Sequence, residues 1–232
     1  PQKAWLMIKR ILRYLSSNRR MGISLKHEYG KELKLNCYSD ASWAPTATKS
    51  QSGLTVMIGN APIYWRSSRQ STIAMSSAEA ELIALSLGAH YTLGIEAVLE
   101  CAGFPMKITL HCDNTAAIKI IQENNGWKSR FYKLRGNRIK ECIDEGIVTL
   151  KFVPGSKQVA DVLTKYSSKA VLVTCMFLCG FREGKDPNDK EEGPNWGEIK
   201  LPELKYIIAN SVILEGMNLP IDTLFVFNTR SL

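Results

Sequence analysis

The chain has 232 residues, 45% of them hydrophobic and 22% charged, which is typical of a soluble globular protein with one main core. Its six cysteines are scattered without a CxxC pair, so neither a disulfide framework nor a zinc site is expected. The longest apolar run, residues 170–179, is shorter than the roughly 18 residues that a membrane-spanning helix needs, and no membrane partner is expected.

The first predicted element is an amphipathic basic helix over residues 3–15, in which apolar side chains such as Trp5 and Ile8 recur at helical spacing. A short strand over residues 21–25 and a polar connector over residues 28–34 follow. No initiator methionine precedes the helix, as expected for a segment of a longer polyprotein.

Three strands joined as hairpins are predicted next, over residues 33–40, 53–59 and 61–67. Gly59-Asn60 marks a tight turn between the second and the third. The link between the first two strands is polar and contains a proline, as a loop should.

A long helix is predicted from Ser76, an N-cap with Glu79 three residues further on, through Leu99. The remaining predicted elements are a strand over 107–113, helices over 114–123 and 130–145, a strand over 147–153, a short helix over 158–166 and an apolar helix to about residue 181. Three hairpin strands followed by alternating units predict an α/β fold with a mixed five-stranded sheet flanked by helices.

Four acidic residues stand where separate elements can bring them together: Asp40, Glu81, Asp113 and Asp161. Asp40 and Asp113 end two strands expected side by side in the sheet, and ligands gather at the carboxyl ends of such strands. Two carboxylates about 5 Å apart repel by on the order of 3 kcal/mol at an effective dielectric constant near 20, so the cluster predicts a neutralising cation. Oxygen ligands without His or Cys nearby favour Mg²⁺, or Mn²⁺, over zinc.

Each aspartate also has a structural interpretation. Asp113 with Asn114 could cap the following helix, Asp161 could compensate a helix dipole, and Asp40 could begin a turn.

Glu79 and Glu81 need to be told apart. They are two residues apart and point in different directions on a helix, so only one can join the cluster. Glu79 already has the capping role, which makes Glu81 the better candidate for binding metal.

Five motifs in this order resemble the ribonuclease H domain of copia-type retrotransposon Pol polyproteins: SDASWA, WRSSRQ, SSAEAEL, CDNTAAI and FVPGSKQVADVLTK. The KRILRYL helix is similar to the segment that links the reverse transcriptase thumb to that domain. The resemblance covers residues 3–181 and implies an RNase H-like fold that hydrolyses the RNA strand of RNA–DNA hybrids during reverse transcription. It implies two Mg²⁺ ions and a catalytic, metal-binding set made of Asp40, Glu81, Asp113 and Asp161.

The resemblance also divides the chain and suggests its partners. Residues 1–34 are expected to be the end of a reverse transcriptase, residues 35–181 the RNase H-like domain, and residues 182–232 a charged linker and an extension of unknown role. The reverse transcriptase of the same polyprotein is an expected partner. A cytoplasmic virus-like particle or the nucleus is the expected location, and secretion is not.

Two departures from the family pattern leave a second class of function open. Residues 130–141 lack both histidines of the family's KHIDIRYHFIRE-like helix, so no His between Asp113 and Asp161 can assist product release. The extension after Phe181 matches nothing in the family. The alternative function is a catalytically silent RNase H-like tether or hybrid-binding module, or a host-adopted interaction protein.

The net charge of +8 is unevenly spread: residues 1–70 carry 12 basic and 3 acidic groups, and residues 111–170 carry 11 and 6. Basic surface near three of the four acids suits a polyanionic substrate, and a merely solubilising surface is the plainer interpretation. Six residues are candidates for contacting phosphates or sugar hydroxyls, including the 2′-OH that distinguishes RNA: Lys49, Ser52, Arg66, Arg69, Gln70 and Asn114.

Overall fold

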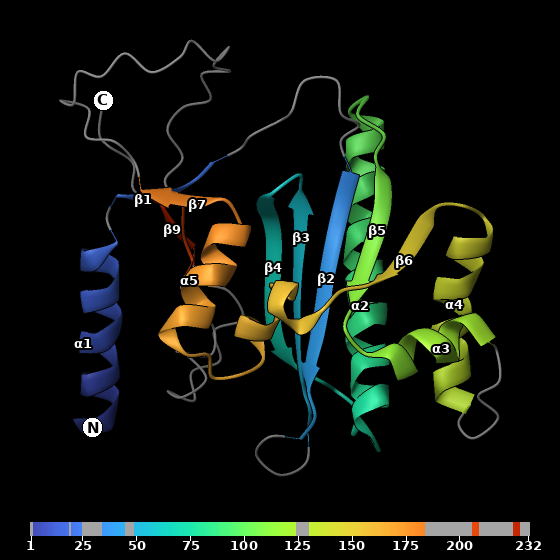
Figure 1. Ribbon diagram of the computed structural model, residues 1–232, viewed down its shortest axis with the longest axis horizontal. Coiled ribbons are helices and arrows are strands. Elements are labelled where there is room, and N and C mark those ends of the chain that lie inside the picture. The colour runs from blue at the N-terminus through green and yellow to red at the C-terminus, as the bar shows by residue number, and fades with distance from the viewer. Residues whose placement is uncertain are drawn as a thin grey trace.

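The computed structural model describes residues 2–18, 20–24, 34–44, 49–123, 130–183, 206–208 and 225–227 (Figure 1). The predicted polar connector, apart from Lys34, and most of the predicted linker and extension after residue 183 lie outside these residues.

A five-stranded sheet in the order β4-β3-β2-β5-β6 forms the centre of the molecule (Figure 1). Its strands are β2 (Lys34–Ser42), β3 (Gln51–Ile58), β4 (Ala61–Arg69), β5 (Lys107–Cys112) and β6 (Val148–Phe152). β3 runs antiparallel to its neighbours β2 and β4, whereas β5 runs parallel to both β2 and β6. The mixed five-stranded sheet predicted from the sequence is confirmed.

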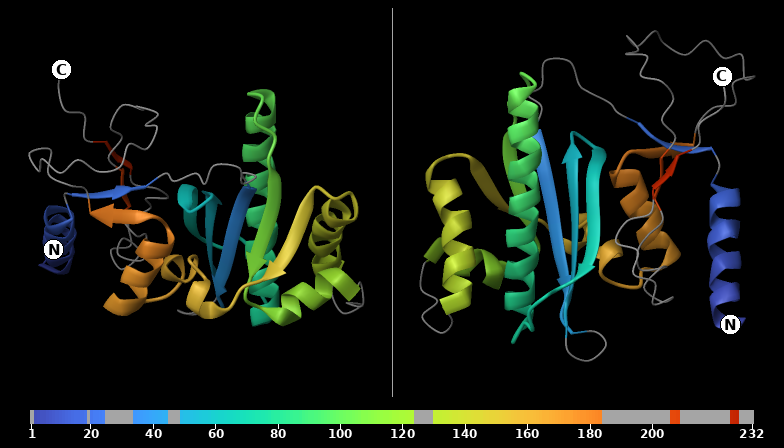
Figure 2. Two further views of the ribbon diagram at one scale, coloured as in Figure 1. Left: turned by 45° about the horizontal axis from the view of Figure 1, so that its top comes forward. Right: turned by 180° about the vertical axis from the view of Figure 1, so that it is seen from behind.

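The helix α2 (Ser77–Cys101) runs along one face of the sheet (Figure 2). Its N-cap is the predicted one, because the Ser76 side chain accepts a hydrogen bond from the backbone N–H of Glu79. Among the described residues, α2 is the only helix long and apolar enough to cross a membrane. Here that apolar character serves the core, where Leu82 and Leu85 are buried against the sheet.

The helices α3 (Thr115–Glu123), α4 (Arg130–Asp144) and α5 (Lys169–Leu178) divide between the two faces of the sheet. The helices α3 and α4 pack with α2, and Ile121 and Ile139 belong to the same core cluster as Leu85. The opposite face receives α5, whose C-cap Cys179 packs with Met57 of β3.

The predicted short helix over residues 158–166 is wrong. Two separate 3₁₀ turns are present instead, η1 (Gly155–Lys157) and η2 (Asp161–Leu163). Gln158 interrupts the helical path with an extended backbone (φ −78°, ψ 93°), and its buried side-chain amide donates to the backbone oxygen of Ser39 at 2.9 Å. A tertiary hydrogen bond to β2 therefore replaces the local helix.

A small antiparallel pair joins two segments that lie far apart in the sequence. The strand β1 (Met21–Ile23) follows α1 (Gln2–Ser17) and pairs with β7 (Phe181–Glu183), which follows α5 (Figure 1). The pair connects residues 21–23 of the first predicted domain with residues 181–183, which lie at the boundary between the second and the third. The domain boundaries themselves stay predictions. A second pair consists of β8 (Tyr206–Ile208) and β9 (Phe225–Phe227).

Candidate active site

The fold delivers the four predicted acids from four different elements to one end of the sheet. Asp40 lies near the end of β2, Asp113 directly follows β5, Glu81 lies in the second turn of α2, and Asp161 begins η2. Alternation along β2 places Asp40 on the same face as Tyr38, where the η1–η2 segment packs.

Asp113 stands at the centre of the cluster. It belongs to two groups of potential metal ligands, one with Asp40 and Asp161 and the other with Glu81 and Cys112. Within each group the ligand atoms lie within 4.8 Å of one another. The expectation of no Cys nearby is wrong for Cys112, because β5 leads directly into Asp113 and brings the thiol with it.

The structural alternatives for two of the acids are now resolved. Asn114 caps α3, because its Oδ1 accepts the backbone N–H of Ala117 at 3.0 Å, and this leaves Asp113 free of the capping role. The Glu79 carboxylate accepts the backbone N–H of Met75 ahead of α2, so Glu81 is the acid that turns to the cluster.

Burial and mutual repulsion raise the pKa values of three of the four acids in the cluster. Burial, and then the charges of Asp40 and Asp113, raise the pKa of Glu81 to about 9. Burial and Asp40 likewise raise the pKa of Asp161 to about 6 and that of Asp113 above its usual value. A divalent cation would reverse these shifts by stabilising the charged carboxylates.

One buried atom of the cluster has an open coordination position. The Oε2 atom of Glu81 is buried and has no hydrogen-bond partner among the described residues, a costly situation for a carboxylate oxygen. A hard cation bound by carboxylate oxygens would supply the partner that this atom lacks. The four acids are therefore chemically suited to hold divalent metal.

Comparison with known proteins shows which proteins the chain is similar to. No protein-family model matches the chain. The chain is 32% identical over 171 residues to the retrovirus-related Pol polyprotein from transposon RE2 of Arabidopsis thaliana, an alignment covering 71% of this chain and 12% of the polyprotein. It is 28% identical over 181 residues to that of transposon TNT 1-94 of Nicotiana tabacum, which covers 76% of this chain and 13% of the polyprotein.

The chain is a relative of the Pol polyproteins of retrotransposons. It spans about an eighth of the length of each of these two relatives. Among solved structures, LC11-RNase H1, isolated from compost, is similar with a TM-score of 0.46 and 16% identity, over 56% of this chain and 92% of the other. The sheet agrees with the mixed five-stranded sheet of the RNase H-like fold predicted above.

Two residues that contact the acidic cluster were not assigned a role from the sequence. The Lys165 ammonium lies 3.2 Å from Oδ1 of Asp40 and 3.1 Å from Oδ1 of Asp161. The Thr164 hydroxyl donates to the other oxygen of Asp40. The spacing of four residues between Asp161 and Lys165 was a usable sequence signal, because such pairs meet on one side of a helical turn.

A glycine allows η2 to approach the sheet. Gly53 of β3 is the register partner of Asp40, and a Cβ atom there would lie 2.8 Å from Cγ2 of Thr164 and 2.9 Å from Cβ of Leu163. The Ser67 hydroxyl of β4 also donates to the backbone oxygen of Leu163 at 2.5 Å. Strands β3 and β4 thus fix the segment that carries Asp161.

Of the six predicted nucleic-acid contacts, Lys49 and Arg69 have exposed side chains, at the end of the sheet where Asp40 lies. Ser52 and Gln70 are buried, and Nε2 of Gln70 donates to the Ser52 hydroxyl at 2.8 Å. Those two residues hold the strand ends together.

Arg66 and Asn114 also have partners within the protein. Nη1 of Arg66 donates to the Tyr91 hydroxyl of α2 at 2.7 Å, on the face of the sheet that α2 covers. Asn114 is the α3 cap. Binding of nucleic acid by any of the six residues stays a prediction.

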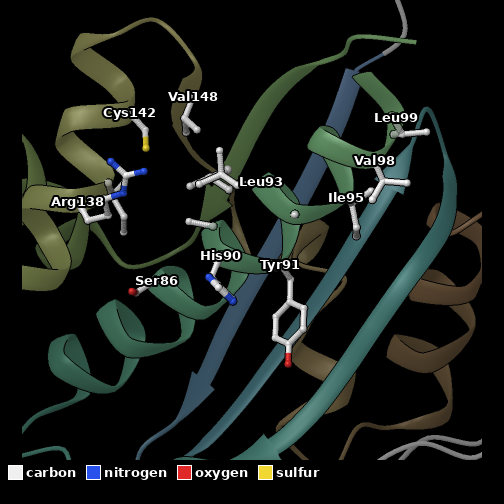
Figure 3. A pocket seen from close by; sticks show the side chains of 14 residues that line it. Ser86, His90, Tyr91, Leu93, Ile95, Val98, Leu99, Arg138, Cys142 and Val148 are labelled. Atoms are coloured by element: carbon white, nitrogen blue, oxygen red, sulfur yellow. The ribbon is translucent and has the colours of Figure 1, made fainter. Parts of the chain in front are cut away.

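A hollow of about 790 Å³ lies away from the acids, between α2 and α4 (Figure 3). Side chains such as Leu93, Val98 and Val148 make its lining largely apolar, and none of its lining residues is acidic. A search for binding sites by cavity volume alone would select this hollow. The acidic cluster lies near the other end of α2, around Glu81.

The raised pKa of Glu81 predicts a pH dependence for the metal-free protein. The folded state holds a proton on Glu81 between pH 4.5 and about 9 that the unfolded state has released, so this contribution to stability is lost as pH rises through that range. The pKa of His111 is lowered from 6.5 to about 4, so His111 makes the free energy of unfolding rise with pH. This opposite effect is confined to pH values below 6.5. We therefore expect the free energy of unfolding to fall between pH 6.5 and 9 in urea titrations with EDTA.

Two controls accompany this measurement. Glu81→Gln removes the titrating group and should flatten the profile, and saturating Mg²⁺ should suppress the decline in the natural sequence. A natural protein whose stability is level across this range without metal would contradict the assigned environment of Glu81.

Proposed function

We propose that this chain is a metal-dependent endonuclease that hydrolyses the RNA strand of RNA–DNA hybrids. The observation that carries the proposal is the convergence of four carboxylates around Asp113, with a buried oxygen of Glu81 left for a cation. The relationship to Pol polyproteins supports a hybrid substrate and a reverse transcriptase in the same polyprotein as the partner.

The proposed cofactor is a pair of Mg²⁺ ions, with Mn²⁺ as a substitute, held by Asp40, Glu81, Asp113 and Asp161. Bound there, the metal supplies activation of the attacking water and stabilisation of the leaving oxygen at phosphorus. The protein contributes rigid placement: Asp40 is fully buried in β2, and Asp113 follows β5 directly. No side chain of this set acts as a covalent nucleophile in the proposal.

A labelled RNA–DNA hybrid provides the test. With Mg²⁺ the protein should cut only the RNA strand and leave products shorter than the substrate, and EDTA should abolish the reaction. Matched RNA–RNA and DNA–DNA duplexes serve as controls and should stay intact. Absence of cleavage by a folded, metal-saturated protein would refute the enzymatic proposal.

A further inference from the structure

Lys165 places a positive charge inside the acidic cluster. Its ammonium contacts one oxygen of Asp40 and one of Asp161, at 3.2 Å and 3.1 Å. These two aspartates and Asp113 form one of the two groups whose oxygens lie close enough to share a metal ion. The cation thus binds the same carboxylates that the proposed metal needs.

The setting of this contact differs from that of a surface ion pair. The Asp40 side chain is fully buried, and its second oxygen accepts a hydrogen bond from Thr164, so both of its oxygens are engaged by neighbouring residues of one segment. An exposed pair contributes little because water screens it, whereas a buried carboxylate that loses its only cation is strongly disfavoured.

Lys165 is also able to leave. Its side chain is 46% exposed, and its long flexible stem can carry the ammonium into solvent. The Thr164 and Lys165 backbone N–H groups both donate to the backbone oxygen of Asp161, so the ammonium can move while the segment stays in place.

We propose that Lys165 is a positioning residue that takes the place of a metal ion between Asp40 and Asp161 in the metal-free protein and must be displaced when metal binds. This inference rests on the metal site of the proposed function. It assigns two effects to one side chain: Lys165 keeps the acidic cluster assembled without metal, and it lowers the affinity for the incoming metal.

The test uses Lys165→Met, which keeps the length of the side chain and removes its charge. Without metal, the variant should melt several degrees below the natural protein, because the carboxylates of Asp40 and Asp161 lose their counter-ion. Calorimetric titration with Mg²⁺ alone, without nucleic acid, should give a dissociation constant about tenfold lower than that of the natural protein, since no ammonium has to be displaced.

Two further variants make the result specific. Lys165→Arg retains the charge and should keep the natural melting temperature and a weak Mg²⁺ dissociation constant. Lys140→Met removes the lysine of another pair spaced four residues apart, Lys140 to Asp144 at 3.2 Å on α4, and should leave Mg²⁺ binding unchanged.

The outcomes separate this inference from the proposed function. An unchanged or higher Mg²⁺ dissociation constant in Lys165→Met, or no Mg²⁺ binding by the natural protein, overturns the displacement role. Tighter Mg²⁺ binding in Lys165→Met together with no cleavage of hybrids by the natural protein upholds the role of Lys165 and overturns the nuclease assignment instead.

Discussion

Asp113→Asn is expected to lower the rate of hybrid cleavage by about a thousandfold or more, which corresponds to roughly 4 kcal/mol of lost transition-state stabilisation. Asp113 is the one acid common to both groups of potential metal ligands, so its loss affects the whole cluster. The amide has the same shape as the carboxylate and keeps the packing. Single-turnover cleavage of a labelled hybrid measures the rate, and a filter-binding assay should show that the hybrid still binds.

The matched control is Asp144→Asn. Asp144 ends α4 and pairs with Lys140 on the surface, away from the cluster. Its substitution should leave the cleavage rate within about twofold of the natural value, because an exposed ion pair contributes little. Cleavage by Asp113→Asn at the natural rate would contradict the assignment of the site.

Gly53→Ala is expected to have the second largest effect. The added Cβ would lie closer than 3.0 Å to two side-chain atoms of the η2 segment, Cγ2 of Thr164 and Cβ of Leu163, which must then move off the sheet. Overpacking of this kind costs about 1–3 kcal/mol of stability. Asp161 and Lys165 move with the segment, and a displacement near 1 Å can lower a rate by about a hundredfold.

Gly94→Ala separates this effect from the general effect of adding a methyl group. Gly94 lies within α2, and nothing lies within 4 Å of the position that its Cβ would take. The helix should gain up to about 1 kcal/mol of stability, and cleavage should be unchanged. Urea unfolding and the cleavage assay together measure both variants. If Gly53→Ala matched Gly94→Ala in both assays, the close approach of η2 would not matter.

The parts of the fold that could be predicted from the sequence are those with local signals. Short apolar runs and the Gly59-Asn60 turn located the hairpin strands, and Ser76 located the start of α2. Asp40 and Asp113 could be placed because each lies at or just beyond the carboxyl end of a predicted strand, and these two strands are parallel neighbours in the sheet.

The parts that could not be predicted depend on contacts between distant residues. The 158–166 helix failed because Gln158 bonds to Ser39, 119 residues away in the chain. The Arg66 side chain points toward α2 because it donates a hydrogen bond to the Tyr91 hydroxyl. The local sequence does not indicate which face of β4 is covered by α2, so this contact could not be predicted. The contact of Lys165 with Asp40 joins residues 125 apart, although its pairing with Asp161 had a local signature.

The pairing of β1 with β7 has a consequence for the order of events during synthesis. Met21 of β1 and Glu183 of β7 are register partners. During synthesis β1 therefore leaves the ribosome long before β7, its strand partner among the described residues, has been made. Every strand of the central sheet is made in that interval. The pairing of β1 with β7 closes a very long loop, which is entropically unfavourable until the chain between them is compact. The formation of this pair therefore depends on the prior folding of the central sheet, to which β1 does not belong.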